Sequence, residues 1–257
     1  MAIITLTSDW GCKDHYLGAI KGKILKLLPE AKIIDISHHI TPFNIEQAAF
    51  IIKNSYTNFP DGTIHIIAIN TEESTTNPHT IVFIDKQYFI GADTGIFSLI
   101  FNKKPDKIIE LDILQDSDYF TFSTRDRFVN AAVRLAKGEE LEKLGDLKDS
   151  INQKILFEPV SEKNVIKGIV SYIDSYENLI TNISEKLFKQ VGKGREFSIY
   201  FRTNSINRIN KSYNDAPEGE ILAIFSSTGL LQIAINKGNA SSLLGMNHKD
   251  PIRIEFK

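Results

Sequence analysis

The 257-residue chain has little of what marks several large classes of protein. It contains one cysteine, Cys12, which excludes a disulfide within the chain and a cysteine-based zinc site. Its net charge is −2, so no strong field favours nucleic acid or an anionic membrane. No apolar run approaches the ~20 residues that span a bilayer, and the first residues read as a strand and not as a signal peptide. These absences predict a cytoplasmic protein that binds neither nucleic acid nor membrane.

What is present is an ordinary globular composition, with 42% hydrophobic and 24% charged residues. In the first part of the chain, strand and helix patterns alternate. Apolar, β-branched runs predict strands at residues 2–7, 33–36, 63–69, 80–84, 87–90 and 108–111. Amphipathic spacing and capping residues predict helices at 14–28, 44–54, 94–101 and 124–137. This alternation predicts a layered α/β domain with a mostly parallel central sheet.

The second part of the chain has short, turn-punctuated strands. They are expected at residues 165–173, 196–200, 219–225, 230–235 and 251–256, with helices only at 185–191 and 241–245. This pattern is typical of a small β-barrel or β-sandwich. A polar stretch separates the two parts. We therefore expect an α/β domain at residues 1–150, a linker at 151–164 and a β-domain at 165–257.

Polar residues follow the predicted strands of the first part, where ligands bind in open α/β sheets. Asp9 comes after the first strand and could accept two hydrogen bonds from a ribose diol, although Asp9 or Asp14 could instead cap the next helix. His38 and His39 point to metal only weakly, because neighbours in an extended chain face opposite sides. We expect no metal site. Phe43 could stack on a heterocycle or belong to the core.

Three further polar segments allow two interpretations each. Residues 121–126 could present free helix N–H groups to an anion, or form an ordinary cap. Asp174 and Asn178 could hold the ammonium and carboxylate groups of an amino acid, or form an Asx turn. Asn236 offers a donor and an acceptor to an adenine edge, or belongs to a hairpin followed by a helix cap.

Taken in order, these segments resemble the S-adenosylmethionine (SAM) hydroxide adenosyltransferase family, which also includes fluorinases and chlorinases. The shared segments span nearly the whole chain: residues 7–11, 35–38, 42–43, 59–65, 91–95, 121–122, 173–182 and 217–240. The resemblance implies an N-terminal α/β domain, a C-terminal β-barrel and a homotrimer that binds SAM between subunits. It also implies substitution at the ribose 5′ carbon, in which SAM is the substrate, methionine leaves and no cofactor or metal is needed.

The resemblance assigns substrate-binding roles to residues of the first part. Asp9 matches the carboxylate that holds the ribose diol, and Phe43 matches an aromatic position against adenosine. Thr121 and Phe122 would line the region near the ribose 5′ carbon.

Further substrate-binding roles fall in the second part. Asp174 and Asn178 match residues that hold the methionine amine and carboxylate. Tyr176 matches an aromatic stacking position, and Ser227 and Asn236 match positions that contact methionine and adenine respectively.

The chain departs from the family pattern where hydrolytic members position water. Those members carry an Asp, an Arg and a His at positions that match Asn70, Asn77 and Ser123. An amide cannot take a proton from water as a carboxylate can. The position that contacts halide in halogenating members matches Thr124, whose hydroxyl could bind an anion at a helix start.

Three functions follow from this pattern. The first is an enzyme that cleaves SAM with water to give adenosine and methionine, for which Glu72, Glu73 or His79 would have to take over the handling of water. The second is a non-catalytic protein that binds or senses SAM or adenosine. The third is an enzyme related to SAM halogenases, with a nucleophile other than water. Family membership favours the first.

Overall fold

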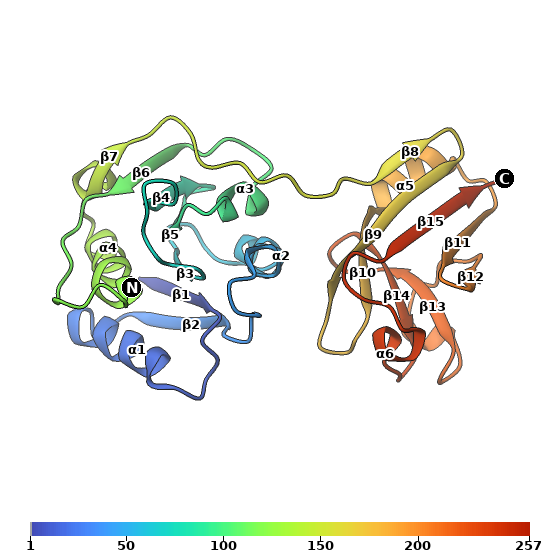
Figure 1. The fold of residues 1–257 in the computed structure, drawn as a ribbon, viewed down its shortest axis with the longest axis horizontal. Coiled ribbons are helices and arrows are strands. Elements are labelled where there is room, and N and C mark those ends of the chain that lie inside the picture. Colours follow the sequence, from blue (N-terminus) through green and yellow to red (C-terminus); the bar gives the residue numbers. More distant parts are fainter. Residues whose placement is uncertain (1) are drawn as a thin grey trace. The chain divides into compact units, whose positions relative to one another are not determined.

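A computed structural model describes residues 2–257, which form two compact units that divide between Ile155 and Leu156 (Figure 1). The division falls within the polar stretch 151–164. Ile151 is buried in the first unit, and the Asn152 backbone N–H donates to Asp93 Oδ2 at 2.8 Å, so the stretch begins as part of that unit. Across residues 2–257, no helix combines the length and the apolar character needed to cross a membrane.

The first unit is built on a seven-stranded sheet with the order β2-β1-β3-β5-β4-β6-β7. The strands are β1 (Ile3–Ser8), β2 (Lys32–Ser37), β3 (Ile64–Ala68), β4 (His79–Ile84), β5 (Gln87–Ala92), β6 (Lys107–Leu111) and β7 (Gly145–Leu147). β2, β1, β3 and β5 are parallel, whereas the pairs β5–β4, β4–β6 and β6–β7 are antiparallel. The expected α/β class is confirmed, with a sheet that is parallel in one half.

Helices cover both faces of this sheet (Figure 1). α1 (His15–Leu27) and α4 (Val129–Ala136) pack on one face, and α2 (Ile45–Lys53) and α3 (Ile96–Ile100) pack on the other. Strand residues alternate between the two layers: Ile66 belongs to the first core and Ile67 to the second. Asn44 caps α2 as predicted, since its Oδ1 accepts the N–H of Gln47 at 2.9 Å. The short 3₁₀ helices are Tyr56–Asn58 and Leu141–Leu144 in this unit and Tyr213–Asp215 in the second.

The helix predicted from residue 124 begins with a π-helical turn. It covers Thr124–Phe128 and continues directly into α4. Ser123 precedes it without a side-chain capping bond, so the segment is not an ordinary N-cap. Single π-turns occur frequently at functional sites, because the extra residue redirects neighbouring side chains.

The second unit is an antiparallel sheet with the order β12-β11-β15-β9-β10-β14-β13, and β8 pairs with β9. Its strands are β8 (Val160–Glu162), β9 (Val165–Ile173), β10 (Leu179–Ser184), β11 (Phe197–Phe201), β12 (Asn204–Ile206), β13 (Ile221–Phe225), β14 (Leu230–Ile235) and β15 (Pro251–Phe256). A bridge between Asn210 and Ile224 joins the segment after β12 to β13. The sheet is thus a nearly closed barrel, as the family resemblance implies. The two predicted helices are α5 (Glu185–Gly192) and α6 (Ala240–Leu244).

Strand β10 is the main element that the sequence pattern misses. Its polar residues suggest a turn, yet Leu179, Thr181 and Ile183 are all fully buried in the barrel. The pairing of β10 with β9 shifts register after Ile180, and the Asn182 side chain accepts the Ile169 N–H at 2.9 Å. The polar side chains therefore replace regular strand hydrogen bonds instead of ending the strand. The three-residue strands β7, β8 and β12 were also not predicted.

A buried hydrogen-bonded chain joins the parallel strands of the first unit. His65 on β3 lies 2.7 Å from Thr5 Oγ1 of β1 through Nδ1 and 2.6 Å from Gln87 Oε1 of β5 through Nε2. Because the Gln87 oxygen accepts, the neutral ring with its proton on Nε2 satisfies both contacts. Burial lowers the pKa of His65 to about 4, although the Gln87 bond acts in the opposite direction.

This low pKa makes the stability of the first unit depend on pH. Between about 4 and the ordinary value of 6.5, the unfolded chain binds a proton that folded His65 excludes. We therefore expect His65 to contribute roughly 3 kcal/mol of stability at pH 7 that is lost as the pH falls through this range. Urea unfolding from pH 4 to 7 should show a smaller pH dependence for His65→Gln than for the wild type. Equal pH dependence in the two proteins would contradict this.

Candidate functional site

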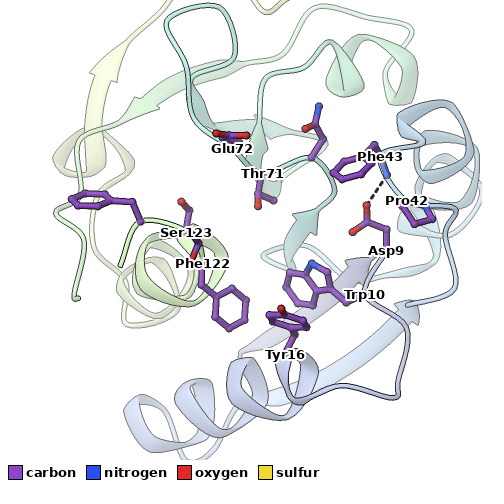
Figure 2. Close-up of a pocket in the computed structure, with 12 residues that line it drawn as sticks. Asp9, Trp10, Tyr16, Pro42, Phe43, Thr71, Glu72, Phe122 and Ser123 are labelled. Carbon is purple, nitrogen blue, oxygen red and sulfur yellow. Dashed lines mark hydrogen bonds between the residues drawn. The ribbon is translucent and has the colours of Figure 1, made fainter. Parts of the chain in front are cut away.

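A pocket of about 580 Å³ opens in the first unit, next to the carboxyl ends of β1 and β3 (Figure 2). Its walls come from the segments that follow β1, β2 and β3 and from the segment that precedes the π-helical turn. The lining residues are Asp9, Trp10, Tyr16, Pro42, Phe43, Asn70, Thr71, Glu72, Phe120, Thr121, Phe122 and Ser123. Parallel pairing places the ends of β1, β2 and β3 at one edge of the sheet, which is where open α/β sheets bind ligands.

Asp9 holds one wall of the pocket in an uncommon conformation. Its Oδ2 accepts the backbone N–H of Phe43 at 2.8 Å. Phe43 has φ = 64°, a left-handed conformation that costs a bulky residue about 1–2 kcal/mol. Asp9 Oδ1 makes no hydrogen bond within the described chain and is available to a ligand. Neither Asp9 nor Asp14 caps α1 through its side chain.

Aromatic rings form the apolar part of the pocket. The Phe122 ring meets Trp10 edge-on at 5.6 Å and Tyr16 edge-on at 5.3 Å between centroids. Figure 2 shows these three rings together, with Asp9 and Phe43 on one side of the pocket and Ser123 on the other. Edge-on packing of this kind fixes the three rings against one another and gives the pocket an apolar wall.

Thr71 and Glu72 line the pocket from the loop after β3 (Figure 2). His79 Nε2 donates to the Thr71 carbonyl oxygen at 2.9 Å. Glu73 forms an ion pair with Arg127 of the π-helical turn. Thr71 and Glu73, the residues on both sides of Glu72, are therefore each fixed by a contact. The ion pair of Glu73 with Arg127 also connects this loop to the π-helical turn that follows Ser123.

His79 itself is fully buried, packed edge-on at 4.7 Å against Phe128. Burial lowers its pKa, and the Arg127 charge adds to that effect, whereas the bond to Thr71 and the Glu73 charge oppose it. The neutral ring donates from Nε2, and Nδ1 lies 3.6 Å from Glu73 Oε1. His79 thus fixes the loop through its bond to Thr71 and is not itself among the residues that line the pocket.

Asp126 fixes the segment that leads to Phe120 and Thr121. Its carboxylate accepts from Ser117 Oγ at 2.6 Å and from Gln115 Nε2 at 3.0 Å. The hydrogen bond from Arg125 is the largest influence on Asp126, and with the Ser117 bond it lowers the pKa to about 2 against the effect of burial. This carboxylate stays charged at physiological pH and keeps the loop in place.

The pocket brings together six of the sequence-predicted site residues. They are Asp9, Phe43, Asn70, Thr121, Phe122 and Ser123. Asn77 and Thr124 do not line it. The Asn77 N–H instead closes a turn onto the Ser74 carbonyl at 3.1 Å. Thr124 is 1% exposed, and its Oγ1 has no hydrogen-bond partner among the described residues.

The remaining predicted residues lie in the second unit. Asp174 forms an Asx turn: Oδ1 accepts the N–H groups of Tyr176 and Asn178, and Oδ2 accepts Asn178 Nδ2 at 2.9 Å. The turn leaves the Tyr176 ring 78% exposed. Ser227 lies in the turn between β13 and β14. Asn236 follows β14, and its Nδ2 donates to the Ala216 carbonyl at 2.8 Å.

The adjacent histidines separate as expected for an extended chain. His38 is buried, with Nδ1 2.6 Å from Ser8 Oγ, whereas His39 is exposed. Within residues 2–257, no group of three or more His, Cys, Asp or Glu side chains could hold a metal ion.

Sequence reasoning did not assign a role to Trp10, Tyr16, Thr71 or Phe120, although all four line the pocket. Trp10 is the only tryptophan and stands beside Asp9, which is a usable signal. Tyr16 and Phe120 reach the pocket from the start of α1 and from a loop, and no local pattern marks either residue.

The fold is that of a two-unit protein with a pocket at the carboxyl edge of a mixed α/β sheet. Family models described as the N-terminal and C-terminal domains of SAM hydroxide adenosyltransferases match residues 4–145 and 168–253. The chain belongs to this SAM hydroxide adenosyltransferase family, which is related to the fluorinases.

Individual relatives extend over the whole chain. An (R)-S-adenosyl-L-methionine hydrolase of Methanocaldococcus jannaschii is 32% identical, with 99% of this chain and 96% of that protein covered. A fluorinase of Actinopolyspora mzabensis is 21% identical, with 98% of this chain and 96% of that protein covered. The crystal structure of an uncharacterized conserved protein from Thermotoga maritima matches with a TM-score of 0.89 and 30% identity, covering 98% of this chain and 99% of that one.

The ion pair between Glu73 and Arg127 links the loop after β3 (residues 69–78, the Glu72 loop) to the π-helical turn, and its contribution can be measured as a change in the free energy of unfolding. Arg127→Met leaves Glu73 and the Leu111 carbonyl, which accepts from Arg127 at 3.1 Å, without their donor. We expect the free energy of unfolding of the first unit to fall by about 2 kcal/mol. Amide hydrogen exchange at residues 71–77 should become faster.

A matched control is Lys107→Met, which removes an exposed ion pair with Glu142 and should change stability by less than about 0.5 kcal/mol. Equal effects of the two substitutions would show that the Arg127 link does not hold the loop.

Proposed function

We propose that the protein hydrolyses SAM at the ribose 5′ carbon and releases adenosine and methionine. The supporting observation is the chemistry of the pocket. Asp9 and Glu72 are acidic, the apolar wall is aromatic, and no Lys, Arg or His is among the lining residues. Such a pocket favours a cation that carries an aromatic group, which describes an adenosyl sulfonium. The Methanocaldococcus jannaschii relative, named as an (R)-SAM hydrolase, supports the same reaction.

In the proposed complex, Asp9 Oδ1 accepts hydrogen bonds from the ribose diol while Oδ2 keeps its bond to Phe43. Phe43 lies against the adenosine, and Thr121 and Phe122 line the space near the 5′ carbon. Water attacks that carbon in line with the C5′–S bond, whose electron pair leaves with sulfur to give neutral methionine. The pocket contributes by positioning the reactants and by excluding bulk water.

The proposal extends to the second unit and to assembly. Asp174 and Asn178 hold the methionine amine and carboxylate, and Tyr176 stacks on the ligand. Ser227 contacts methionine and Asn236 contacts adenine. The protein acts as a homotrimer, in which the second unit of one subunit completes the pocket of another. The exposed Tyr176 ring beside the ordered Asp174 turn is consistent with a surface that becomes covered.

A halide nucleophile is the less favoured alternative. Glu72 places a negative charge in the pocket, and this charge repels an anion but not water. Thr124, which matches the halide-contacting position, is buried and does not line the pocket. Asn70 and Ser123 do line it, but neither is a base.

Incubation with SAM tests the proposal directly. Purified protein with SAM, in the presence and absence of chloride, should give adenosine and methionine in equal amounts and no 5′-chloro nucleoside. Chromatography of the nucleosides provides the measurement. Calorimetric SAM binding without turnover would indicate a non-catalytic SAM-binding protein, and a halogenated nucleoside would indicate a halogenase.

The role of Asp9 is tested by adenosine binding. We expect Asp9→Ala to weaken binding by about 2 kcal/mol, because the ribose loses hydrogen bonds to a charged acceptor. Asp9→Asn keeps an acceptor for the Phe43 N–H and should lose less, which separates contact with the ligand from support of the wall. Titration calorimetry gives both affinities. Unchanged affinity in Asp9→Ala would remove Asp9 from the ribose site.

A further inference from the structure

We propose that Glu72 is the catalytic residue that takes the proton from the attacking water, and that Glu73, Arg127 and His79 are positioning residues for it. This inference rests on the proposed function and names the group that makes water an effective nucleophile. It concerns residues of the loop after β3 and of the π-helical turn.

The first reason is that Glu72 is the available carboxylate of the pocket. The lining residues include two acids, Asp9 and Glu72. Asp9 is committed through Oδ2 to the Phe43 backbone. Glu72 makes no hydrogen bond or ion pair with any residue in the described part of the chain, so both of its oxygens can accept. The other polar side chains of the lining carry hydroxyls, the Trp10 indole N–H and the Asn70 amide, which are not bases at physiological pH.

The second reason is that the backbone of Glu72 is held on both sides although its side chain has no partner. The Thr71 carbonyl accepts from buried His79 at 2.9 Å, and Glu73 pairs with Arg127. Arg127 is itself fixed by donation to the Leu111 carbonyl at 3.1 Å. A base is most effective when its carrier is fixed and its oxygens are unoccupied before water binds.

The third reason is the placement of Glu72 in the pocket. Figure 2 shows Glu72 and Ser123 on the side away from Asp9 and Phe43. In the proposed complex the ribose diol binds Asp9 and the 5′ carbon lies toward Thr121, Phe122 and Ser123, so it points to the side of the pocket that Glu72 also lines. The carboxylate can therefore reach a water that attacks the 5′ carbon, and its charge also stabilises the sulfonium ligand.

The step balances without any further reactant. The water oxygen forms a bond to C5′ as the C5′–S bond breaks, and the bonding pair stays on sulfur as the thioether of methionine. The proton that water loses passes to the Glu72 carboxylate and then to solvent. The net products are adenosine, methionine and one proton.

The test compares Glu72→Gln with Glu30→Gln, which changes an exposed glutamate outside the pocket. Glu72→Gln should lower kcat for adenosine formation by on the order of 10²–10³-fold, because an amide cannot accept the proton. Binding of neutral adenosine should stay within about twofold of the wild type, which shows that the pocket is intact. Glu30→Gln should leave both quantities unchanged.

The pH profile distinguishes a base from a structural residue. Wild-type kcat should fall in acid as the carboxylate is protonated, and this fall should disappear in Glu72→Gln. Glu72→Asp keeps a carboxylate, so it should retain the fall in acid and restore part of the rate. Glu73→Gln should lower kcat by about tenfold while retaining the fall in acid, because it loosens the position of the base without removing it.

The outcomes separate the two proposals. If the wild type forms adenosine and Glu72→Gln turns over like Glu30→Gln, the assignment of Glu72 is overturned and SAM hydrolysis stands. If the wild type forms no adenosine, both proposals fall. If Glu72→Gln does not bind adenosine, Glu72→Asp replaces it as the test. A kcat of Glu72→Asp that falls in acid supports the assignment, and a kcat that does not fall overturns it.

Discussion

The parallel pairing of β1 with β3 is the constraint on which the rest of the first unit depends. The buried contact between Thr5 and His65 fixes this pairing within the core, and the neutral imidazole makes it possible without burying a charge. Because both strands run the same way, Asp9 and Asn70 emerge at one edge of the sheet. A pocket at this edge follows from topology, and the loops only decide its chemistry.

The two acidic residues of the pocket, Asp9 and Glu72, differ in how their side chains are bonded within the protein. Asp9 accepts the backbone N–H of Phe43, whose conformation is left-handed, through Oδ2, and its Oδ1 has no hydrogen-bond partner among the described residues. The Glu72 side chain, in contrast, has no hydrogen-bond partner among the described residues, whereas the residues before and after it, Thr71 and Glu73, are both bonded to other parts of the unit. His79 and Arg127 hold those neighbours from outside the pocket. Two carboxylates and no basic side chain among the lining residues give the pocket a negative charge, which favours a cationic ligand over an anionic one.

Much of this was predictable from the sequence because it depends on local patterns. Strand runs, the Asn44 cap and the order of the family motifs predicted the two-unit architecture and the positions of Asp9 and Phe122. The polar strand β10 was not predictable, because the Asn182 side chain substitutes for a backbone bond at a register shift. The position of Tyr16 in the pocket was not predictable either, because Tyr16 lies at the start of α1 and the packing of this helix depends on residues distant in the sequence. The Glu72 loop required the structure, since nothing local indicates that Arg127 would hold it.

The central claim is that the pocket beside β1 and β3 holds an adenosyl sulfonium with its sugar on Asp9. The most direct measurement is a crystal structure of the protein with adenosine and methionine, or with SAM, bound. The account predicts ribose hydroxyls within hydrogen-bond distance of the Asp9 carboxylate, and the 5′ carbon on the side of Thr121 and Glu72. A nucleoside found outside this pocket, or with its ribose turned away from Asp9, would contradict the account.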